Sequence, residues 1–352
     1  MKKPTFCYFL LAALAIFQAC KHKTNTTPNL ESDGIPGEIM VVAKEDQIAE
    51  IESLFAKYFQ IKNENLIVSE KSGSGQFENK FNYFFVRHKA YEGTEKTAPN
   101  IIIWGNAGQF SEDLDALKPS KTIQTGPFEI HYYKNIWAKN QLIAWVKKDA
   151  SNAEESTIKA IAAACTNYFY LNETLPGNML PSKYIDSINR LISDNYGFKL
   201  AIPSQFKLEM TNTEIIWLRQ ETTRFYRDIF INIFSDSLPI DSKENAIENR
   251  NLFCKKYLKN DEGTLVLVST SPTFLSYFKK TTDLGNANTS TLRGWYQEEG
   301  TYRRGPFIRT FFHDKPHKRY IALDQFVYAP DMPRSMFYHT AEIIARSLTF
   351  DK

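Results

Sequence analysis

Alternating patterns of strand and helix fill most of this chain, and they break clearly only once. The hydrophobic periodicity stops at Leu175, Pro176 and Gly177. Short apolar runs typical of strands and amphipathic stretches typical of helices occur on both sides of that point. A chain of 352 residues exceeds what one hydrophobic core usually serves. We therefore expect an N-terminal domain over 36–175 and a C-terminal domain over 176–352.

The order of these patterns predicts the fold class. We expect strands at 39–43, 66–68, 81–87, 101–104, 128–133, 136–146, 198–202, 215–220, 225–234, 265–269, 292–297, 307–313 and 319–328. We expect the longer helices to begin near 46, 151, 182, 242 and 333. Each half then becomes a mostly antiparallel sheet with helices packed on it, which is α+β architecture. By the order of its elements the second half also resembles the small PsbP/Mog-like α/β sandwich, a likeness that implies no chemistry.

The first twenty residues have the layout of a bacterial lipoprotein signal. Lys2 and Lys3 form a basic start, an apolar run extends from Phe6 to Phe17, and a cysteine follows at Cys20. The run is shorter than the about 20 residues that a bilayer-spanning helix needs. This length favours export and cleavage over a permanent membrane span. We expect residues 1–19 to be removed, with an ordinary secretory signal as the alternative.

Lipid attached to Cys20 would anchor the protein to a membrane. Stable anchoring takes at least two acyl signals, which the diacylglycerol of a lipoprotein cysteine would supply. Residues 20–35 are polar and rich in Thr and Asn, so we expect them to form a disordered tether. The absence of an acidic cluster after Cys20 favours the outer membrane with the protein facing the periplasm, over the cell surface.

The net charge of the chain limits its possible partners, and its cysteine content limits its possible disulfides. Lys and Arg number 43 and Asp and Glu 40, so the chain without its leader is almost neutral. Nucleic-acid binding needs a clustered basic surface, and we expect no nucleic-acid partner. Cys165 and Cys254 each fall on the apolar side of a predicted helix. They are either buried thiols or, in an oxidising periplasm, a disulfide.

The sequence carries none of the well-marked catalytic motifs. It has no Gly-x-Ser-x-Gly elbow, phosphate loop, dinucleotide fingerprint or Cys-x-x-Cys pair. His313 and His317, with Asp314 between them, could ligate zinc. However, Pro316 and the flanking strands favour a hairpin turn here. We expect no metal site, no cofactor and no catalytic residue that the sequence can identify.

Two weaker candidate sites remain. Guanidinium groups flank a tryptophan on neighbouring predicted strands, an arrangement suited to an anion or glycan contact; its members are Arg293, Trp295, Arg303, Arg304 and Arg309. The alternative is a solvated sheet face whose arginines pair with nearby carboxylates. Ser237, in the tripeptide Asp236-Ser237-Leu238, fits a short O-glycan acceptor pattern in a loop after a strand.

Several runs of residues together resemble a known family. They are GIPGEIMVVAKE (34–45), NIWAKNQLIAWV (135–146), YGFKLAIPSQF (196–206), IIWLRQE (215–221), LRGWYQ (292–297), RRGPFIRTFFHD (303–314) and IALDQFVYAPDMPR (321–334). The chain is similar to the domain of unknown function 4837 family, lipoproteins of Bacteroidetes-type bacteria. That family usually has Met-Gly-Gly-Pro-Phe where this chain has Arg303 and Arg304 before Gly305-Pro306-Phe307. The resemblance implies a location and a fold, and no activity.

These observations lead to two hypotheses about function. The first is a membrane-anchored, non-catalytic binding or scaffold module of the envelope, whose partner is an envelope protein or a glycan. The second is an envelope hydrolase with an unmarked active site. A deep pocket in which ionisable groups converge with strongly shifted acidity would favour the hydrolase.

Overall fold

The computed structural model describes residues 28–67, 77–87, 94–237, 239–258, 266–269, 274, 276–281 and 289–351. The predicted signal peptide and Cys20 lie outside the described residues. Within the described ranges, no helix combines the length and the apolar character needed to cross a bilayer.

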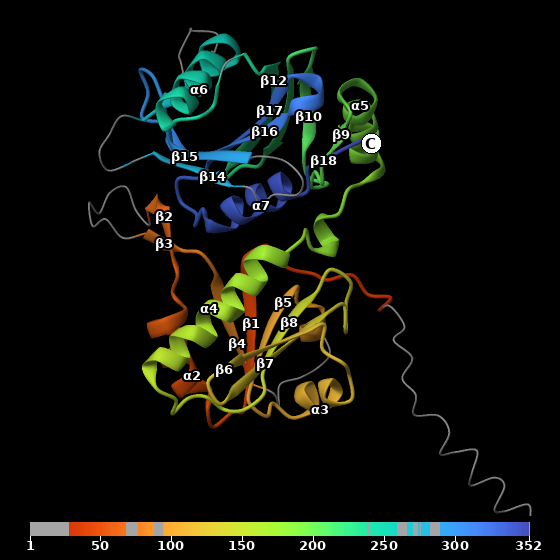
Figure 1. The fold of residues 1–352 in the computed structure, drawn as a ribbon, viewed down its shortest axis with the longest axis vertical. Helices are drawn as coiled ribbons and strands as arrows, with labels where there is room; N and C mark the ends of the chain where they lie inside the picture. The colour runs from red at the N-terminus through yellow and green to blue at the C-terminus, as the bar shows by residue number, and fades with distance from the viewer. Residues whose placement is uncertain are drawn as a thin grey trace, which may run out of the picture.

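The N-terminal domain is built on a six-stranded sheet in the order β4-β1-β5-β8-β7-β6 (Figure 1). Its strands are β1 (Glu38–Ala43), β4 (Asn82–Arg87), β5 (Asn100–Trp104), β6 (Lys121–Thr125), β7 (Phe128–Lys134) and β8 (Leu142–Val146). β1 pairs in parallel with β4 and β5, and β5 pairs in parallel with β8, while β6, β7 and β8 are joined antiparallel. The sheet is therefore mixed, not mostly antiparallel as the sequence predicted for this half. Every residue of β5 and β8 is buried, which is typical of strands covered on both faces.

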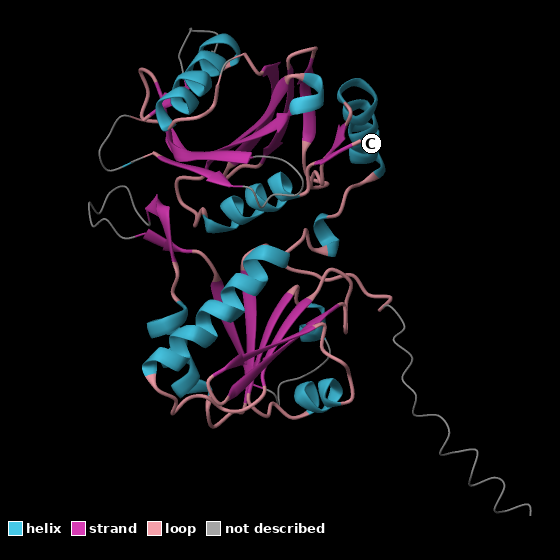
Figure 2. Ribbon diagram, viewed as in Figure 1, coloured by secondary structure: helices cyan, strands magenta, loops and turns pink. Residues whose placement is uncertain are grey.

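Helices cover both faces of this sheet (Figure 2). One face packs against α2 (Ile48–Leu54), the π-helical turn η1 (Phe55–Phe59) and α4 (Glu155–Asn172), around the indole of Trp104. The other face packs against α3 (Gln109–Asp115) through Phe110 and Leu114. A short hairpin of β2 (Lys62–Ile67) and β3 (Phe77–Asn79) and the 3-10 turn η3 (Thr94–Thr97) complete the domain.

The C-terminal domain has an eight-stranded antiparallel sheet, which confirms the expected architecture of this half. The order is β10-β11-β12-β17-β16-β15-β13, and β14 also pairs with β15. The strands are β10 (Lys207–Thr211), β11 (Ile215–Glu221), β12 (Tyr226–Ser235), β13 (Val266–Val268), β14 (Tyr277–Thr281), β15 (Thr289–Glu298), β16 (Arg304–Asp314) and β17 (Arg319–Tyr328). With the N-terminal domain, this makes the fold class α+β.

Three helices cover the two faces of this second sheet. They are α5 (Lys183–Tyr196) and α7 (Ser335–Arg346) on one face and α6 (Lys243–Tyr257) on the other. The predicted helix boundaries hold: the Ser182 hydroxyl accepts from the Ile185 amide, and Gly197 ends α5 with φ of 71°. Ser242 caps α6 in the same way. The connection η4 (Gly177–Met179) precedes α5, and a small sheet of β9 (Phe198–Lys199) and β18 (Thr349–Phe350) lies beside it.

The two domains meet at α7, which lies between the C-terminal sheet and the N-terminal domain (Figure 1). The Glu78 carboxylate of the β3 strand accepts from the Arg334 and Ser335 amides at the start of α7, at 2.6 and 2.8 Å. His339 of α7 lies 3.3 Å from the Glu173 carboxylate, and both are almost fully buried. Polar contacts therefore fix how α7 sits against the first domain.

The predicted tether is shorter than expected at its C-terminal end. The Ser32 amide donates to the Lys139 carbonyl, the Lys139 amide donates to Leu30, and the Asp33 amide donates to Thr97. Ser32 is 1% exposed. Residues 30–33 are thus bound to the N-terminal domain by backbone hydrogen bonds, which their polar composition did not reveal because the main chain supplies the contacts.

Both cysteines of the folded part are free and buried. Cys165 belongs to the core of the N-terminal domain and Cys254 to the core under α6. Burial raises the pKa of the Cys165 thiol to about 12 and that of Cys254 to about 11. Because they sit in different domains, the two thiols do not form the disulfide that was the alternative.

Gly305 is required by the close approach of β16 and β17. A Cβ at this position would lie 2.1 Å from the Val327 carbonyl oxygen. The preceding Arg304 packs its guanidinium over Phe274, 5.2 Å from the ring centroid. The family that the chain resembles usually has two glycines here. This chain therefore keeps the glycine that lies at the close approach.

Replacing Gly305 by alanine is expected to lower the free energy of unfolding by about 3 kcal/mol, the upper range for overpacking, because the contact is with backbone that cannot rotate away. Urea unfolding followed by circular dichroism measures it. Gly300→Ala is the control, since nothing lies within 4 Å of its Cβ and only its φ of 75° is strained. Equal losses in the two variants would show that the close approach is unimportant.

Candidate functional site

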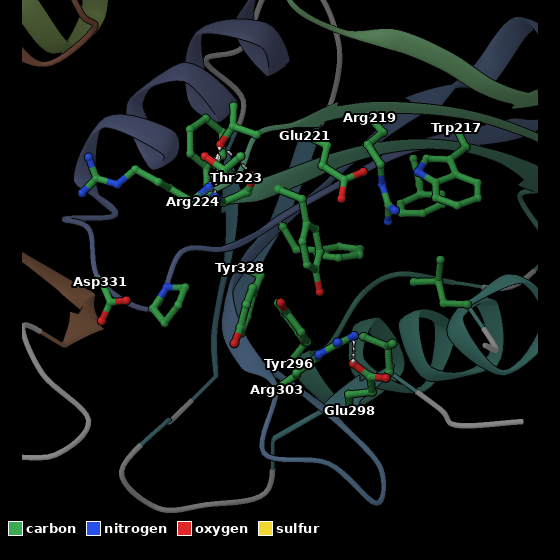
Figure 3. A pocket seen from close by; sticks show the side chains of 18 of the residues that line it. Trp217, Arg219, Glu221, Thr223, Arg224, Tyr296, Glu298, Arg303, Tyr328 and Asp331 are labelled. Carbon is green, nitrogen blue, oxygen red and sulfur yellow. Dashed lines mark hydrogen bonds and ion pairs between the residues drawn. The ribbon is translucent and has the colours of Figure 1, made fainter. Parts of the chain in front are cut away.

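A cavity of about 700 Å³ opens at one end of the C-terminal sheet, where α6 ends and no longer covers it (Figure 3). We call it the aromatic pocket. Its aromatic lining is Trp217, Phe225, Tyr226, Phe230, Tyr257, Tyr296, Phe326 and Tyr328. Its charged lining is Arg219, Glu221, Arg224, Glu298, Arg303 and Asp331, and Thr222, Thr223, Leu258, Val266 and Pro330 complete it. The volume falls within the range usual for small-molecule sites.

The rings form a ladder across neighbouring strands. Tyr328 stacks on Tyr226 with centroids 5.3 Å apart, and Trp217 stacks on Phe230 at 5.3 Å. The Arg219 guanidinium lies between these pairs, 4.8 Å from the Trp217 ring and 5.1 Å from the Tyr226 ring. Because antiparallel neighbours on one face stand side by side, the strand register places these rings in contact. The floor of the pocket is therefore rigid and apolar, with one guanidinium inserted.

Asp228, the cross-strand neighbour of Arg219, orients two members of this ladder. Its carboxylate is 1% exposed and accepts from Arg219 Nε at 2.7 Å and Nη2 at 3.0 Å. It also accepts from the Trp217 indole nitrogen at 2.7 Å. This bidentate geometry orients the guanidinium and the indole together. Asp228 is therefore a positioning residue for the aromatic pocket.

Tyr296 brings a buried hydroxyl to the pocket. The residue is 1% exposed, and its buried hydroxyl lies beside the Tyr226 phenol, with which it interacts. Burial raises the pKa of Tyr296 well above 10, and burial also raises that of the neighbouring Tyr226. Both phenols thus stay protonated near neutral pH and can donate hydrogen bonds. Figure 3 shows the phenols of Tyr296 and Tyr328 directed toward the middle of the pocket.

Charged side chains of both signs surround the opening. Glu298 and Arg303, at the two ends of the β15–β16 turn, lie 4.0 Å apart. The Arg303 side chain is 56% exposed, whereas that of Glu298 is 11% exposed. Three arginines and three carboxylates line the pocket in total. The lining is therefore close to electrically neutral and offers both donors and acceptors.

The five residues predicted as an anion or glycan contact do not come together. Trp295 is 1% exposed and stacks on Phe274, and Arg309 is fully buried beside Asp324. Arg293 lies on the same face of β15 as Trp295 and pairs with Glu342 of α7 at 2.5 Å. Arg304 packs over Phe274. Trp295 and Arg304 therefore share a contact with Phe274. Because side chains alternate between the faces of a strand, Arg309 lies on the opposite face, against Phe253 of α6. Of the five residues, only Arg303 lines the aromatic pocket.

The other predicted sites lie in turns, and the glycan-acceptor role of Ser237 stays a prediction. Ser237 is exposed in the turn after β12, beside Asp236, and Leu238 of the proposed glycan-acceptor tripeptide lies outside the described residues. The predicted hairpin turn is confirmed: η6 (Lys315–His317) joins β16 to β17. His317 pairs there with Asp314 at 2.9 Å, and His313 pairs with Asp236 at 3.2 Å.

Sequence reasoning missed most of the aromatic pocket. Trp217, Arg219 and Glu221 come from one of the runs quoted for the family resemblance, and Phe326, Tyr328 and Asp331 come from another. Both runs were interpreted only as strands. Alternate positions of 215–221 carry Trp217, Arg219 and Glu221, which gives one strand face an unusual mixture of charge and indole. That mixture was the available signal.

The family comparison covers the domain that contains this site. Residues 186–347 match the family model described as Domain of unknown function (DUF4837). The C-terminal domain belongs to this family. The resemblance expected from the sequence is thereby confirmed for the DUF4837 domain, and every residue that lines the aromatic pocket falls inside the matched range. The resembling runs at 34–45 and 135–146 lie outside it.

Other comparisons add little. No curated protein matches the chain. The crystal structure of the Saccharomyces cerevisiae Ran-binding protein Mog1p is similar with a TM-score of 0.31 and 7% identity, covering 44% of this chain and 90% of that one. A mutant of protein Mog1 is similar with a TM-score of 0.29 and 7% identity, covering 44% and 92%. Likeness at this level carries no argument about the function of the DUF4837 domain.

Proposed function

We propose that this protein is a lipid-anchored, non-catalytic binding module of the cell envelope, and that it holds its ligand in the aromatic pocket. The observation that carries the proposal is the pocket itself: a cavity of about 700 Å³ with a rigid ring ladder, a buried Tyr296 hydroxyl and rim charges of both signs. Concave, largely apolar sites with a few placed polar groups are the usual form of ligand sites.

The polar groups of the pocket favour binding over the hydrolase hypothesis. Arg219 is engaged by Asp228, and the phenols of Tyr226 and Tyr296 hold their protons more tightly than usual. Such groups donate hydrogen bonds and orient a ligand. A general base, in contrast, needs a pKa near the working pH.

The anchor and the location complete the proposal. The basic start, the short apolar run and Cys20 support export and lipid attachment, and the outer membrane facing the periplasm remains the proposed location. Its partner would be a molecule of the envelope. A permanent anchor suits a protein whose role depends on where it is held.

Ligand binding can be tested with the pocket's own tryptophan. Fractionated envelope extract from the native host should change the intrinsic fluorescence of the wild-type protein, and Trp217→Phe should remove most of that change. Trp137→Phe is the control, because Trp137 belongs to the N-terminal domain, where it packs on Phe110. If no fraction gives a signal that depends on Trp217, or if a fraction is chemically turned over, the binding proposal is wrong.

The anchor is tested separately by fractionation. The wild-type protein should sediment with membranes and carry the added mass of acyl chains on its first residue. Cys20→Ala should appear in the soluble periplasmic fraction with the same folded body. An unmodified N-terminus in membrane-associated wild-type protein would contradict lipid anchoring.

A further inference from the structure

A second cluster of charged side chains lies outside the aromatic pocket, where α4 meets α7 between the two domains (Figure 1). Tyr170 of α4 lies at its centre. The Lys80 ammonium is 3.3 Å from the centroid of the Tyr170 ring, and the Arg346 guanidinium is 5.3 Å from it. Lys80 belongs to the connection between β3 and β4, whereas Arg346 ends α7. Two cations from different domains therefore lie against the same phenol ring.

The carboxylate in this cluster is already held by another arginine. Glu342 accepts from Arg293 Nη2 at 2.5 Å and from the Tyr170 hydroxyl at 3.1 Å. Arg293 and Glu342 therefore count as one neutral pair. Lys80 and Arg346 make no ion pair within the described part of the chain, and the Arg346 guanidinium donates to the neutral Glu173 main-chain carbonyl at 3.4 Å.

The carboxylate of Glu173 is engaged by other groups. It accepts from the Gly37 amide at 2.8 Å and from the Asn100 side chain at 2.6 Å, and it lies 3.3 Å from His339 Nδ1. The residue is 4% exposed. Its carboxylate therefore does not neutralise Lys80 or Arg346 by direct contact.

The surroundings of Lys80 reflect this excess of positive charge. Burial lowers the pKa of Lys80 below its ordinary 10.5, and the charges of Arg293, Arg346 and Lys279 lower it further, against the opposite effect of Glu342. Cations gathered in a partly buried place are costly unless an anion neutralises them. Lys80 and Arg346 are half-buried, and Lys279 of β14 is exposed, so an anion can reach this cluster from solution.

We propose that Lys80, Arg346 and Lys279 form an anion site that binds a phosphate group at the junction of the two domains. A phosphate monoester carries about −1.5 to −2 charges near neutral pH, which matches the two half-buried cations. A guanidinium can donate to two phosphate oxygens at once, and an ammonium acts as a point charge beside them.

This site goes beyond the proposed function, because none of its three cations lines the aromatic pocket. Since the cations come from both domains, a bound phosphate adds a contact between them. The same chemical group occurs in the headgroup of a phospholipid and in soluble phosphate esters. The experiment below separates these two sources.

The first measurement is calorimetric titration of the soluble form of the protein, Cys20→Ala, with inorganic phosphate at constant ionic strength. Direct titration is needed because phosphate also stabilises folded proteins without binding to them. We expect saturable binding of one phosphate per chain. Lys80→Gln should weaken it at least about tenfold, since a contact with a charged group is lost.

Two neighbouring lysines of β14 give a matched pair of variants. Lys279→Gln should weaken phosphate binding about threefold, as expected for an exposed cation. Lys280→Gln makes the same change in net charge, but Lys280 is exposed on the opposite face of the strand and should bind as the wild type does. If Lys80→Gln does not fold, this pair alone decides the outcome.

The second measurement identifies the source of the phosphate. The same soluble form and its variants are sedimented with phosphatidylcholine vesicles that contain or lack phosphatidic acid. Binding that needs both phosphatidic acid and Lys80 supports the site with a lipid headgroup as its ligand, whereas saturable binding of inorganic phosphate alone supports it with a soluble ester. The proposal is overturned if neither binds, if Lys80→Gln binds as the wild type does, or if Lys279→Gln and Lys280→Gln have equal effects. Any of these results leaves the aromatic pocket and its proposed function untouched.

Discussion

Replacing Asp324 by asparagine is expected to lower the free energy of unfolding of the C-terminal domain by about 3–5 kcal/mol, the usual cost of removing one partner from a buried ion pair. Asp324 lies beneath α6, and its carboxylate is 2.8 Å from Arg250 Nε and 3.1 Å from Arg309 Nη1. All three side chains are fully buried. Because two guanidinium groups share one carboxylate, the substitution leaves two buried cations without a counterion.

Neutral groups already surround these arginines and cannot replace the lost charge. Arg309 Nη2 donates to Asn232 at 3.0 Å and to Asn249 at 2.8 Å. The Arg250 guanidinium lies 3.9 Å from the centroid of the Phe307 ring. These contacts stay the same in the asparagine variant, so the measured loss reports the missing negative charge.

Chemical denaturation monitored by near-UV and far-UV circular dichroism measures this effect. Asp351→Asn is the control, since Asp351 pairs with the exposed Lys199 at 2.8 Å and surface pairs contribute little. A triple variant, Asp324→Leu with Arg250→Met and Arg309→Met, should recover most of the stability, because apolar groups can replace a whole buried ionic cluster. If Asp324→Asn were as stable as the control, the cluster would not be a determinant of the fold.

The same cluster shows what the sequence could and could not reveal. Arg250 lies on the buried side of α6 with Phe253 and Cys254, a position where an arginine must find a buried partner. That partner, Asp324, is 74 residues away in sequence, and helix periodicity holds no information about it. Arg309 was grouped into an anion or glycan contact because Arg303 and Arg304 lie shortly before it in sequence. The local hydrophobic pattern therefore predicted the helices and strands. It did not predict which buried carboxylate each arginine pairs with, because the partners are far apart in sequence.

The sequence did not predict the relative direction of the N-terminal strands, for a similar reason. β1, β5 and β8 read as buried apolar runs, and such runs look alike in parallel and antiparallel sheets. Their parallel pairing depends on the connections through the hairpin of β2 and β3 and through α3, which pattern alone does not orient. The aromatic pocket was missed because five separate strands each contribute only one to three of its side chains. Only the charged face of β11, with Trp217 and Arg219, marked it locally.

Replacing Glu342 by glutamine is expected to loosen the contact between the two domains. Glu342 of α7 is buried and accepts from Arg293 Nη2 at 2.5 Å and from the Tyr170 hydroxyl of α4 at 3.1 Å. It therefore joins the C-terminal sheet, α7 and the N-terminal domain in one network. Loss of its charge should cost about 3 kcal/mol, and calorimetry should then resolve two domain transitions where the wild type shows one.

The network also predicts the direction of the response to acid. Burial by itself would raise the pKa of Glu342, but nearby positive charges outweigh burial and hold it below the ordinary value of 4.5; they are Arg293, His339, Lys80 and Arg346. With a folded pKa below the unfolded one, the stabilisation is fully present above pH 4.5 and is lost as the pH falls through the lower folded value. Acid titration of the domain transitions should thus show a loss below pH 4.5 that is smaller in Glu342→Gln. Glu52→Gln, on the exposed side of α2, is the control and should follow the wild-type curve; a Glu342→Gln curve parallel to the wild type would place the acid-sensitive contact elsewhere.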